Sequence, residues 1–375
     1  MTPELHQAFI LLQQGQPQAA LTILLNLPSL LAPDPNVRLM RGIAQSLIGD
    51  KESAVLTYQE LLRDFPNHPA ALINMGADLF TLSRLDEALK TLSAAKIATP
   101  DIPMVDLNLG NAHKALGQLD EALKCYDAAL SLNQNYSEAW SNRGDVLCQL
   151  GRVSDAINDY KEAIRLNPAN HEALHNLGLT YFEAKRFEEG LDLVNQALAL
   201  KPDFAIAYNS LGIGLVRTKR IDAGIAAYQR TISLAPHLAD PYFNLAETFA
   251  EQRLFHEAIK LYELAVARSD NPTSKIGALL HTKMKICDWS DYESLTQQLL
   301  NGLMTSNCAI SPFTILGLPS SAALQKHAAI NFSAKVYPVD PKALLKPLQP
   351  PQHDKAQIRV GYLSSDFYAH ATAYL

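Results

Sequence analysis

At 375 residues, with 48% hydrophobic and 19% charged side chains, the chain has the composition of a globular protein, which argues against disorder throughout. Its formal net charge is −6, but residues 1–272 hold 23 basic and 32 acidic side chains, and residues 273–375 hold 9 and 6. An N-terminal part at −9 repels a phosphate backbone, so we expect no nucleic-acid partner.

Cysteine usage and hydropathy point to a reducing, aqueous compartment. The four cysteines are widely spaced and form no C-x-x-C pair; they are Cys125, Cys148, Cys287 and Cys308. The N-terminus has acidic Glu4 where a secretory leader has basic residues, and no apolar run approaches the length of about 20 residues that spans a membrane. We therefore expect a cytoplasmic protein with no membrane partner.

A period of 34 residues runs from the N-terminus. Six glycines stand 34 residues apart, and an alanine, Ala246, occupies the seventh place. The glycines are Gly42, Gly76, Gly110, Gly144, Gly178 and Gly212. A small residue follows each of these places by twelve positions, and a large residue, such as Tyr58 or Tyr126, follows it by sixteen. Small residues let two helices approach closely and large ones fill the space between repeats, so the period indicates a stack of helical hairpins.

This pattern resembles the tetratricopeptide repeat. In its frame the repeats begin at Pro35, Pro69, Pro103, Ser137, His171, Ala205 and Ala239, and a degenerate copy precedes them. The sequence therefore predicts an all-α fold, with eight tetratricopeptide repeats forming a superhelical solenoid over residues 1–272.

One segment, residues 171–181, is similar to a zinc-protease signature. HEALHNLGLTY places His171 and His175 one helical turn apart, with Glu172 between them. The same frame in the previous repeat, SEAWSNRGDVL, shows that Glu172 and Gly178 belong to the repeat. Tyr181 stands where the signature needs its third ligand, so we expect no metal site and no cofactor in this chain.

Asparagines recur two residues before the glycine place. They are Asn74, Asn108, Asn142, Asn176 and Asn244, with Ser210 in the sixth repeat of the series. An amide offers one acceptor and two donors, which can pair with the main chain of an extended peptide whatever its side chains are. The alternative is structural, because asparagine at this place can also bond to a neighbouring helix. The first reading predicts a groove for acceptor proteins or extended peptides.

After the repeats, residues 273–335 predict a helical transition region. Apolar spacing favours a helix from Lys275 to Cys287, and Ser290 to Glu293 fits a capping box that starts a second helix. A third helix is expected from Pro319 to Lys335, with proline in its first turn.

Residues 336–357 are proline-rich and predict an extended linker. Beyond it, Ile358 to Leu363 predicts a strand and His370 to Leu375 the start of a helix. One strand cannot bury enough apolar surface to fold alone, so residues 358–375 are expected to open an incomplete α/β, doubly wound domain.

Three segments resemble the O-linked N-acetylglucosamine transferase and SPINDLY family: the CDWSDY run from Cys287, the Ser311 to Phe313 segment, and IRVGYLSSDF from Ile358. The resemblance implies a protein O-glycosyltransferase, a hexosyltransferase whose repeats hold acceptor proteins. It implies that the asparagines bind acceptor backbones and that His370 is the active-site histidine. The family has proline after that histidine, where this chain has Ala371.

The donor pocket of that family lies beyond Leu375, so the resemblance assigns no residue here to a nucleotide sugar such as UDP-GlcNAc. The chain alone is expected to be inactive. The alternative function is a non-enzymatic repeat scaffold that binds peptides, and sequence encoded after Leu375 would discriminate between the two.

Overall fold

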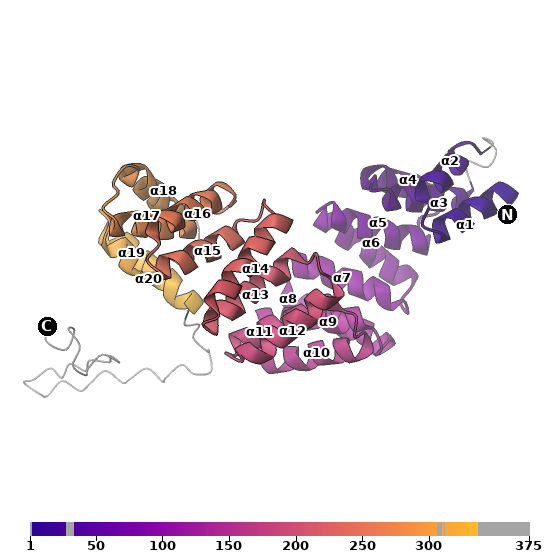
Figure 1. Cartoon of the computed structure of the whole chain (residues 1–375). Coiled ribbons are helices and arrows are strands. Elements are labelled where there is room, and N and C mark those ends of the chain that lie inside the picture. Colours follow the sequence, from indigo (N-terminus) through magenta and orange to yellow (C-terminus); the bar gives the residue numbers. More distant parts are fainter. Residues whose placement is uncertain (1, 28–33, 306–309, 311, 337–375) are drawn as a thin grey trace, which may run out of the picture. The chain divides into compact units, whose positions relative to one another are not determined.

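The computed structural model describes residues 2–27, 34–305, 310 and 312–336. These residues form α-helices and no β-strand, which confirms the predicted all-α class (Figure 1). The chain divides into two compact units between Asp270 and Asn271, here called unit 1 and unit 2. The linker predicted for residues 336–357 overlaps the helix α20 (Ala322–Val336) at Val336; its other residues, the strand predicted for residues 358–363, and His370 lie outside the described residues.

Unit 1 is a succession of helical hairpins. The first helices of the repeats are α1 (Pro3–Gln13), α3 (Pro35–Leu47), α5 (Pro69–Thr81), α7 (Pro103–Ala115), α9 (Ser137–Gln149), α11 (His171–Glu183), α13 (Ala205–Arg217) and α15 (Asp240–Glu251). The second helices are α2 (Pro17–Leu25), α4 (Lys51–Asp64), α6 (Leu85–Ala98), α8 (Leu119–Leu132), α10 (Val153–Leu166), α12 (Phe187–Leu200), α14 (Ile221–Leu234) and α16 (Phe255–Ala267).

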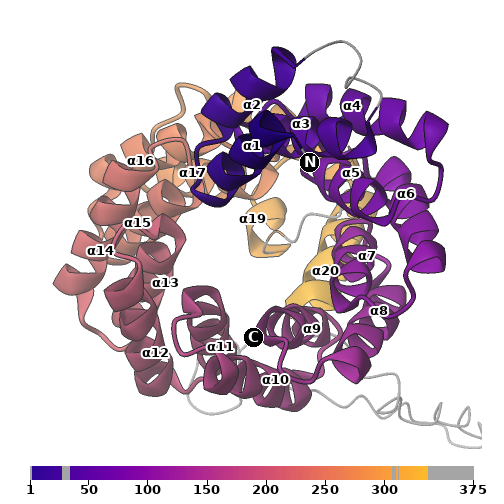
Figure 2. The ribbon, with the colours of Figure 1, turned by 90° about the vertical axis from the view of Figure 1, so that its right-hand side faces the viewer.

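The predicted repeat frame agrees with these helices. Six of the seven predicted starts are the observed ones, and only α15 begins one residue late, at Asp240. Ala239 already has helical dihedrals there, φ −75° and ψ −38°, so the difference lies within the usual uncertainty of a helix end. In Figure 2 the first helices α3 to α15 follow one another along the inner side of the superhelix, and the second helices form its outer layer.

Helix pairs meet at the glycine place. A Cβ on Gly110 would lie 2.5 Å from Cε1 of Tyr126, so only hydrogen fits there without movement of the ring. Tyr126 itself is fully buried between α7 and α8. The period of small and large residues in the sequence therefore records the approach of two helices within each repeat.

The turn between the two helices of a repeat needs a left-handed residue. Gly117 and Gly151 supply it with φ of 73° and 74°, but Lys185 and Lys219 occupy the same place with φ of 59° and 66°. Lys219 N–H donates to the carbonyl of Val216 at 3.0 Å and so closes α13. A residue with a Cβ is strained in this conformation.

Unit 2 contains α17 (Thr273–Lys285), α18 (Tyr292–Thr305), α19 (Pro312–Leu316) and α20 (Ala322–Val336). The expected helix to Cys287 ends two residues earlier, because Cys287 adopts a left-handed φ of 57°. The side chain of Lys283 is buried, and its Nζ lies 2.8 Å from Oδ2 of Asp291. This ion pair ties the end of α17 to the residue before α18.

Two helix starts in unit 2 differ from the prediction. α18 begins at Tyr292, one residue after the start that a cap at Ser290 predicts, which is within the usual uncertainty of a helix end. The Ser290 hydroxyl donates to Oδ1 of Asp288 at 2.7 Å. The helix predicted from Pro319 begins at Ala322, where the hydroxyl of Ser321 accepts from the N–H of Leu324. The short helix α19 was not predicted.

Replacing Lys219 by Gly should stabilise unit 1 by about 1 kcal/mol, because glycine adopts a positive φ without strain. The measurement is urea denaturation followed by circular dichroism. Lys219→Ala is the matched control, since it removes the same amine and keeps the Cβ. Equal stability of the two variants would show that the left-handed backbone is not the cause.

Candidate functional site

The recurring asparagines lie on one face of the first helices. Their side chains are half-buried. Those of Asn142, Asn176 and Asn244 bond to the preceding first helix, and the common 34-residue frame gives Asn74 and Asn108 the same direction. Arg143, which follows Asn142, shows the opposite direction: it pairs with Asp127 on α8 and Asp159 on α10. The first helices that carry the asparagines form the inner layer of unit 1 (Figure 2).

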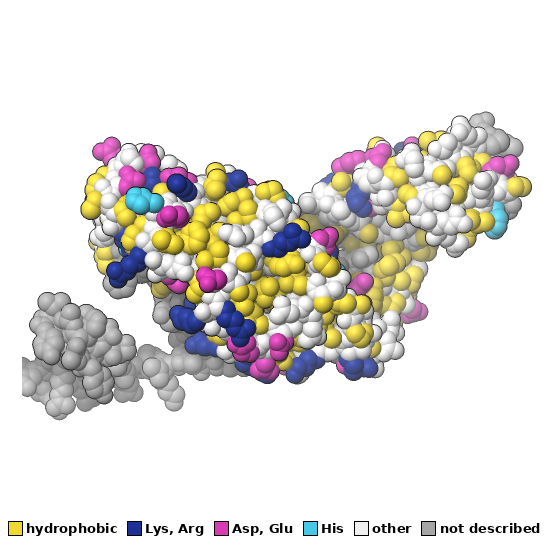
Figure 3. All heavy atoms as spheres, in the orientation of Figure 1, with side chains coloured by type: hydrophobic (Ala, Val, Ile, Leu, Met, Phe, Trp, Pro, Cys, Tyr) yellow, Lys and Arg dark blue, Asp and Glu magenta, His cyan; other side chains and the backbone are white. Residues whose placement is uncertain are grey.

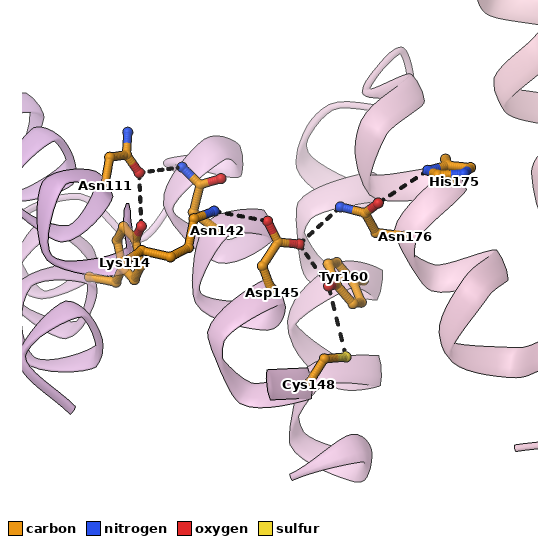
Figure 4. Close-up of polar contacts among 9 residues, drawn as sticks. Asn111, Lys114, Asn142, Asp145, Cys148, Tyr160, His175 and Asn176 are labelled. Atoms are coloured by element: carbon orange, nitrogen blue, oxygen red, sulfur yellow. Dashed lines mark hydrogen bonds and ion pairs between the residues drawn. The ribbon is translucent and has the colours of Figure 1, made fainter. Parts of the chain in front are cut away.

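Two of these asparagines bond to the preceding repeat (Figure 4). Asn142 Nδ2 donates to Oδ1 of Asn111 at 3.0 Å, and Asn176 Nδ2 donates to Oδ1 of Asp145 at 2.9 Å. In both cases the acceptor stands 31 residues earlier in the chain. The structural reading of the asparagines thus holds for Asn142 and Asn176.

The same acceptors receive a second bond from a buried tyrosine. Tyr126 OH donates to Asn111 and Tyr160 OH donates to Asp145, both at 2.8 Å (Figure 4). Burial, with the nearby Asp145 carboxylate, raises the pKa of both tyrosines, so they remain protonated donors. Lys114 Nζ lies 3.0 Å from the other carboxylate oxygen of Asp145 and compensates its charge. Asn111 and Asp145 each join two repeats.

Asn74 and Asn108 have no such acceptor in the preceding repeat. The residues 31 positions before them are Ile43 and Ala77, and neither side chain can accept a hydrogen bond. Both amides are half-buried and form no side-chain hydrogen bond with any other residue in the part of the chain that the structure describes. Their donors and acceptors remain available to a ligand.

The missing acceptor also explains a buried hydroxyl. Tyr58 stands at the large-residue place of its repeat, and its OH would reach residue 43 by analogy with Tyr126 and Asn111. Ile43 occupies that place, and the Tyr58 OH is buried without a partner among the described residues. One apolar residue therefore removes both the tyrosine's acceptor and the next asparagine's acceptor.

In the last repeats, the residues that bond between neighbouring first helices are separated by 35 residues and not by 31. Asn244 Nδ2 donates to Oδ1 of Asn209 at 3.0 Å, and the Oγ of Ser210 lies 2.9 Å from Nε2 of His175. Desolvation lowers the pKa of the buried His175, so the ring is neutral near pH 7.

The histidines of the HEALH segment lie in packed surroundings. Nδ1 of His175 is 3.2 Å from Oδ1 of Asn176, so both of its ring nitrogens have protein partners. His171 and His175 each contact the ring of Phe204 edge-on, with centroids 5.2 Å apart. Of the two histidines, only His175 uses its ring nitrogens for hydrogen bonds; the Nε2 of His171 is buried without a partner among the described residues.

The CDWSDY segment joins α17 to α18 in unit 2. Trp289 is exposed and contacts Tyr292 edge-on, with ring centroids 5.3 Å apart. The other residues of the resemblance, including Ser311 and His370, lie outside the described part of the chain. The structure therefore does not place a catalytic histidine near the asparagines.

The surface in Figure 3 is mixed in charge. Lys and Arg side chains lie in small groups beside Asp and Glu, and hydrophobic side chains reach the surface between them. A phosphate backbone is bound best by a continuous basic surface, and this face does not offer one. As for membranes, the helices of the described residues are all too short or too polar to cross one.

The chain matches two family models. A model described as "Cilia and flagella-associated protein 70 C-terminal domain" matches residues 5–220, and a tetratricopeptide-repeat model matches residues 209–272. A search of curated proteins found no match. Neither family model describes a glycosyltransferase, so the narrower resemblance remains a hypothesis.

Two solved structures with TM-scores above 0.5 agree on the fold. A tetratricopeptide repeat protein from Parabacteroides merdae is 19% identical with a TM-score of 0.55, and the match covers 66% of this chain and 98% of that one. The Cut9-Hcn1 assembly of APC/C is 13% identical with a TM-score of 0.54, covering 84% of this chain and 59% of that one. MamA is 27% identical over 43% of this chain and 94% of its own, with a TM-score of 0.38. Since the first family model matches more than half of the chain, and the 34-residue frame continues through the second, the chain belongs to the tetratricopeptide-repeat family.

Proposed function

We propose that unit 1 is a scaffold that binds extended protein segments along the inner face of its first helices. The observation that carries the proposal is the pair of unpaired amides, Asn74 and Asn108, in consecutive repeats. Each of these amides offers donors and an acceptor that no other described residue uses, and a peptide backbone can pair with both.

Of the five recurring asparagines, only Asn74 and Asn108, in the N-terminal part of the series, are free for this binding. Asn142 and Asn176 use an amide N–H to join repeats, and Asn244 does so through Asn209. Asn74 and Asn108 have no such task. A bound segment would therefore contact α5 and α7 through its main chain, and the later asparagines would hold the repeats in register.

Changing Asn74 and Asn108 together to Ala should weaken peptide binding about tenfold or more, because each lost amide removes up to two hydrogen bonds of about 1 kcal/mol. The melting temperature should stay within about a degree, since neither amide has an internal partner. Binding is measured on an array of random fifteen-residue peptides, with affinities of the strongest binders determined by fluorescence anisotropy.

The matched control is Asn142→Ala with Asn176→Ala, which should instead lower thermal stability by removing a donor from each of Asn111 and Asp145. Unchanged peptide affinity in the Asn74 and Asn108 variant would reject the proposed groove.

A gain of an internal acceptor should act in the opposite direction. Ala77→Asn places an amide at the position that Asn111 has in the next repeat, 31 residues before Asn108. We expect Asn108 to bond to it, which raises the melting temperature and lowers peptide affinity. Ala77→Leu is the control of similar size without an acceptor. Equal peptide affinity in both variants would contradict the role of the free Asn108 amide.

As a second and separate function, we propose that these repeats present acceptor proteins to a protein O-glycosyltransferase. The support is the sequence resemblance of the CDWSDY and IRVGYLSSDF segments, with His370 as the candidate catalytic residue. A neutral imidazole there would accept a proton from the attacking hydroxyl.

The transferase proposal is tested by incubating labelled UDP-GlcNAc with an array-selected peptide. The protein at its native length should transfer sugar, and transfer should fall by orders of magnitude in His370→Ala. Full activity of that variant would remove His370 from the mechanism, and no transfer with any sugar nucleotide would reject the proposal.

A further inference from the structure

The inner face of unit 1 changes in chemical character along its length. On each first helix the asparagine place shares a face with the residues four before it, three after it and seven after it, because of the helical repeat of 3.6 residues. These four places form what we call the inner stripe. Its residues on α3, α5 and α7 are Asn36, Met40, Ile43, Leu47, Ala70, Asn74, Ala77, Thr81, Met104, Asn108, Asn111 and Ala115.

None of these residues is charged, and several are apolar and reachable. Leu47 is 59% exposed and Met104 is 45% exposed, at opposite ends of the stripe on α3 and α7. Ile43 and Ala77 are half-buried between them. The unpaired amides of Asn74 and Asn108 therefore stand in apolar surroundings, where hydrogen bonds to a ligand are stronger than in water.

The next two repeats carry carboxylates at the same places. The inner stripe on α9 and α11 consists of Glu138, Asn142, Asp145, Gln149, Glu172, Asn176, Leu179 and Glu183. Asp145 is compensated by Lys114. Glu138, Glu172 and Glu183 are exposed, and none pairs with another residue in the described ranges. This part of the stripe contains no cation.

The two parts are continuous. Figure 2 shows α3, α5, α7, α9 and α11 in succession along the inner side of the superhelix, and the Asn142 to Asn111 bond connects α9 directly to α7. An extended segment that bonds to Asn74 and Asn108 would therefore reach the carboxylates if it continued along the stripe. Neighbouring helices lie roughly 10 Å apart and an extended chain rises about 3.3 Å per residue, so about three residues pass each first helix.

Resting on the proposed peptide-binding function, we infer that unit 1 selects bipartite protein segments: about nine uncharged, largely apolar residues on α3 to α7, followed by lysines or arginines on α9 and α11. Apolar side chains cover Leu47 and Met104, the peptide backbone pairs with the free amides, and the basic residues face Glu138, Glu172 and Glu183. Charge complementarity selects the segment and fixes its position along the groove.

The test uses the full chain and three labelled fifteen-residue peptides measured by fluorescence anisotropy at low and high salt. The first joins an apolar block to a lysine block, the second has the same composition with lysines spread evenly, and the third has glutamate in place of lysine. The first should bind about tenfold tighter than the third, as expected for three exposed charge pairs, and its advantage should shrink with salt. Equal affinity of the first and second peptides would overturn the bipartite selection.

Two sets of variants separate the causes. Glu138→Gln, Glu172→Gln and Glu183→Gln together should abolish the advantage of the lysine block. The control removes three exposed carboxylates from second helices, by Asp120→Asn, Asp192→Asn and Asp222→Asn, and should preserve it. If both sets reduce binding equally, net charge and not the stripe attracts the peptide, and the inference fails.

The proposed function has its own readout in the same assay. An uncharged apolar peptide should bind to α3, α5 and α7 without the carboxylates, so its affinity should fall in the double Ala variant and stay unchanged in the triple Gln variant. If the uncharged peptide behaves in this way but the lysine block does not increase affinity, the proposed groove is supported and the inferred preference for basic residues is rejected. Absence of binding by every peptide would reject the groove and the selectivity together.

Discussion

The contact between the glycine place of a first helix and the large residue of its second helix determines the rest of unit 1. At Gly110 the absence of a Cβ lets the ring of Tyr126 approach the helix backbone. The ring then carries its hydroxyl to Asn111, and Asn111 accepts from Asn142 in the following repeat. Packing within a repeat thus positions the acceptor that joins it to the next one.

The same relation explains why the repeats differ on their inner face. Where the residue that precedes the asparagine by 31 positions is polar, as for Asn142 and Asn176, the asparagine amide donates a hydrogen bond to it. Where it is Ile43 or Ala77, the amide has no partner among the described residues. The proposed peptide binding uses these places, where the structural hydrogen bond is missing, while the helices themselves keep the same geometry.

The sequence predicted the helices of unit 1 well because the 34-residue period reports packing, which repeats in every hairpin. It predicted unit 2 less well, because no period exists there and a polar side chain has more than one possible partner. The Ser290 hydroxyl, for example, bonds to Asp288. Sequence reasoning found the asparagines but gave binding and structural roles equal standing. The choice depends on contacts 31 residues apart, which become visible only when α7 and α9 are placed side by side.

The uneven polar network has a consequence for cooperativity. In a linear array each repeat is stabilised by its own hairpin and by the interface with its neighbours. The interfaces from α7 to α11 include side-chain bonds through Asn111 and Asp145. Those from α3 to α7 lack these bonds and are joined instead through Asp78, which accepts from Ser46 and Lys51, and through the Lys96 to Asp106 pair. The hairpins that hold the free amides are thus joined by contacts that do not involve the asparagines. A ligand there would stabilise these hairpins, so that binding and repeat order are thermodynamically linked.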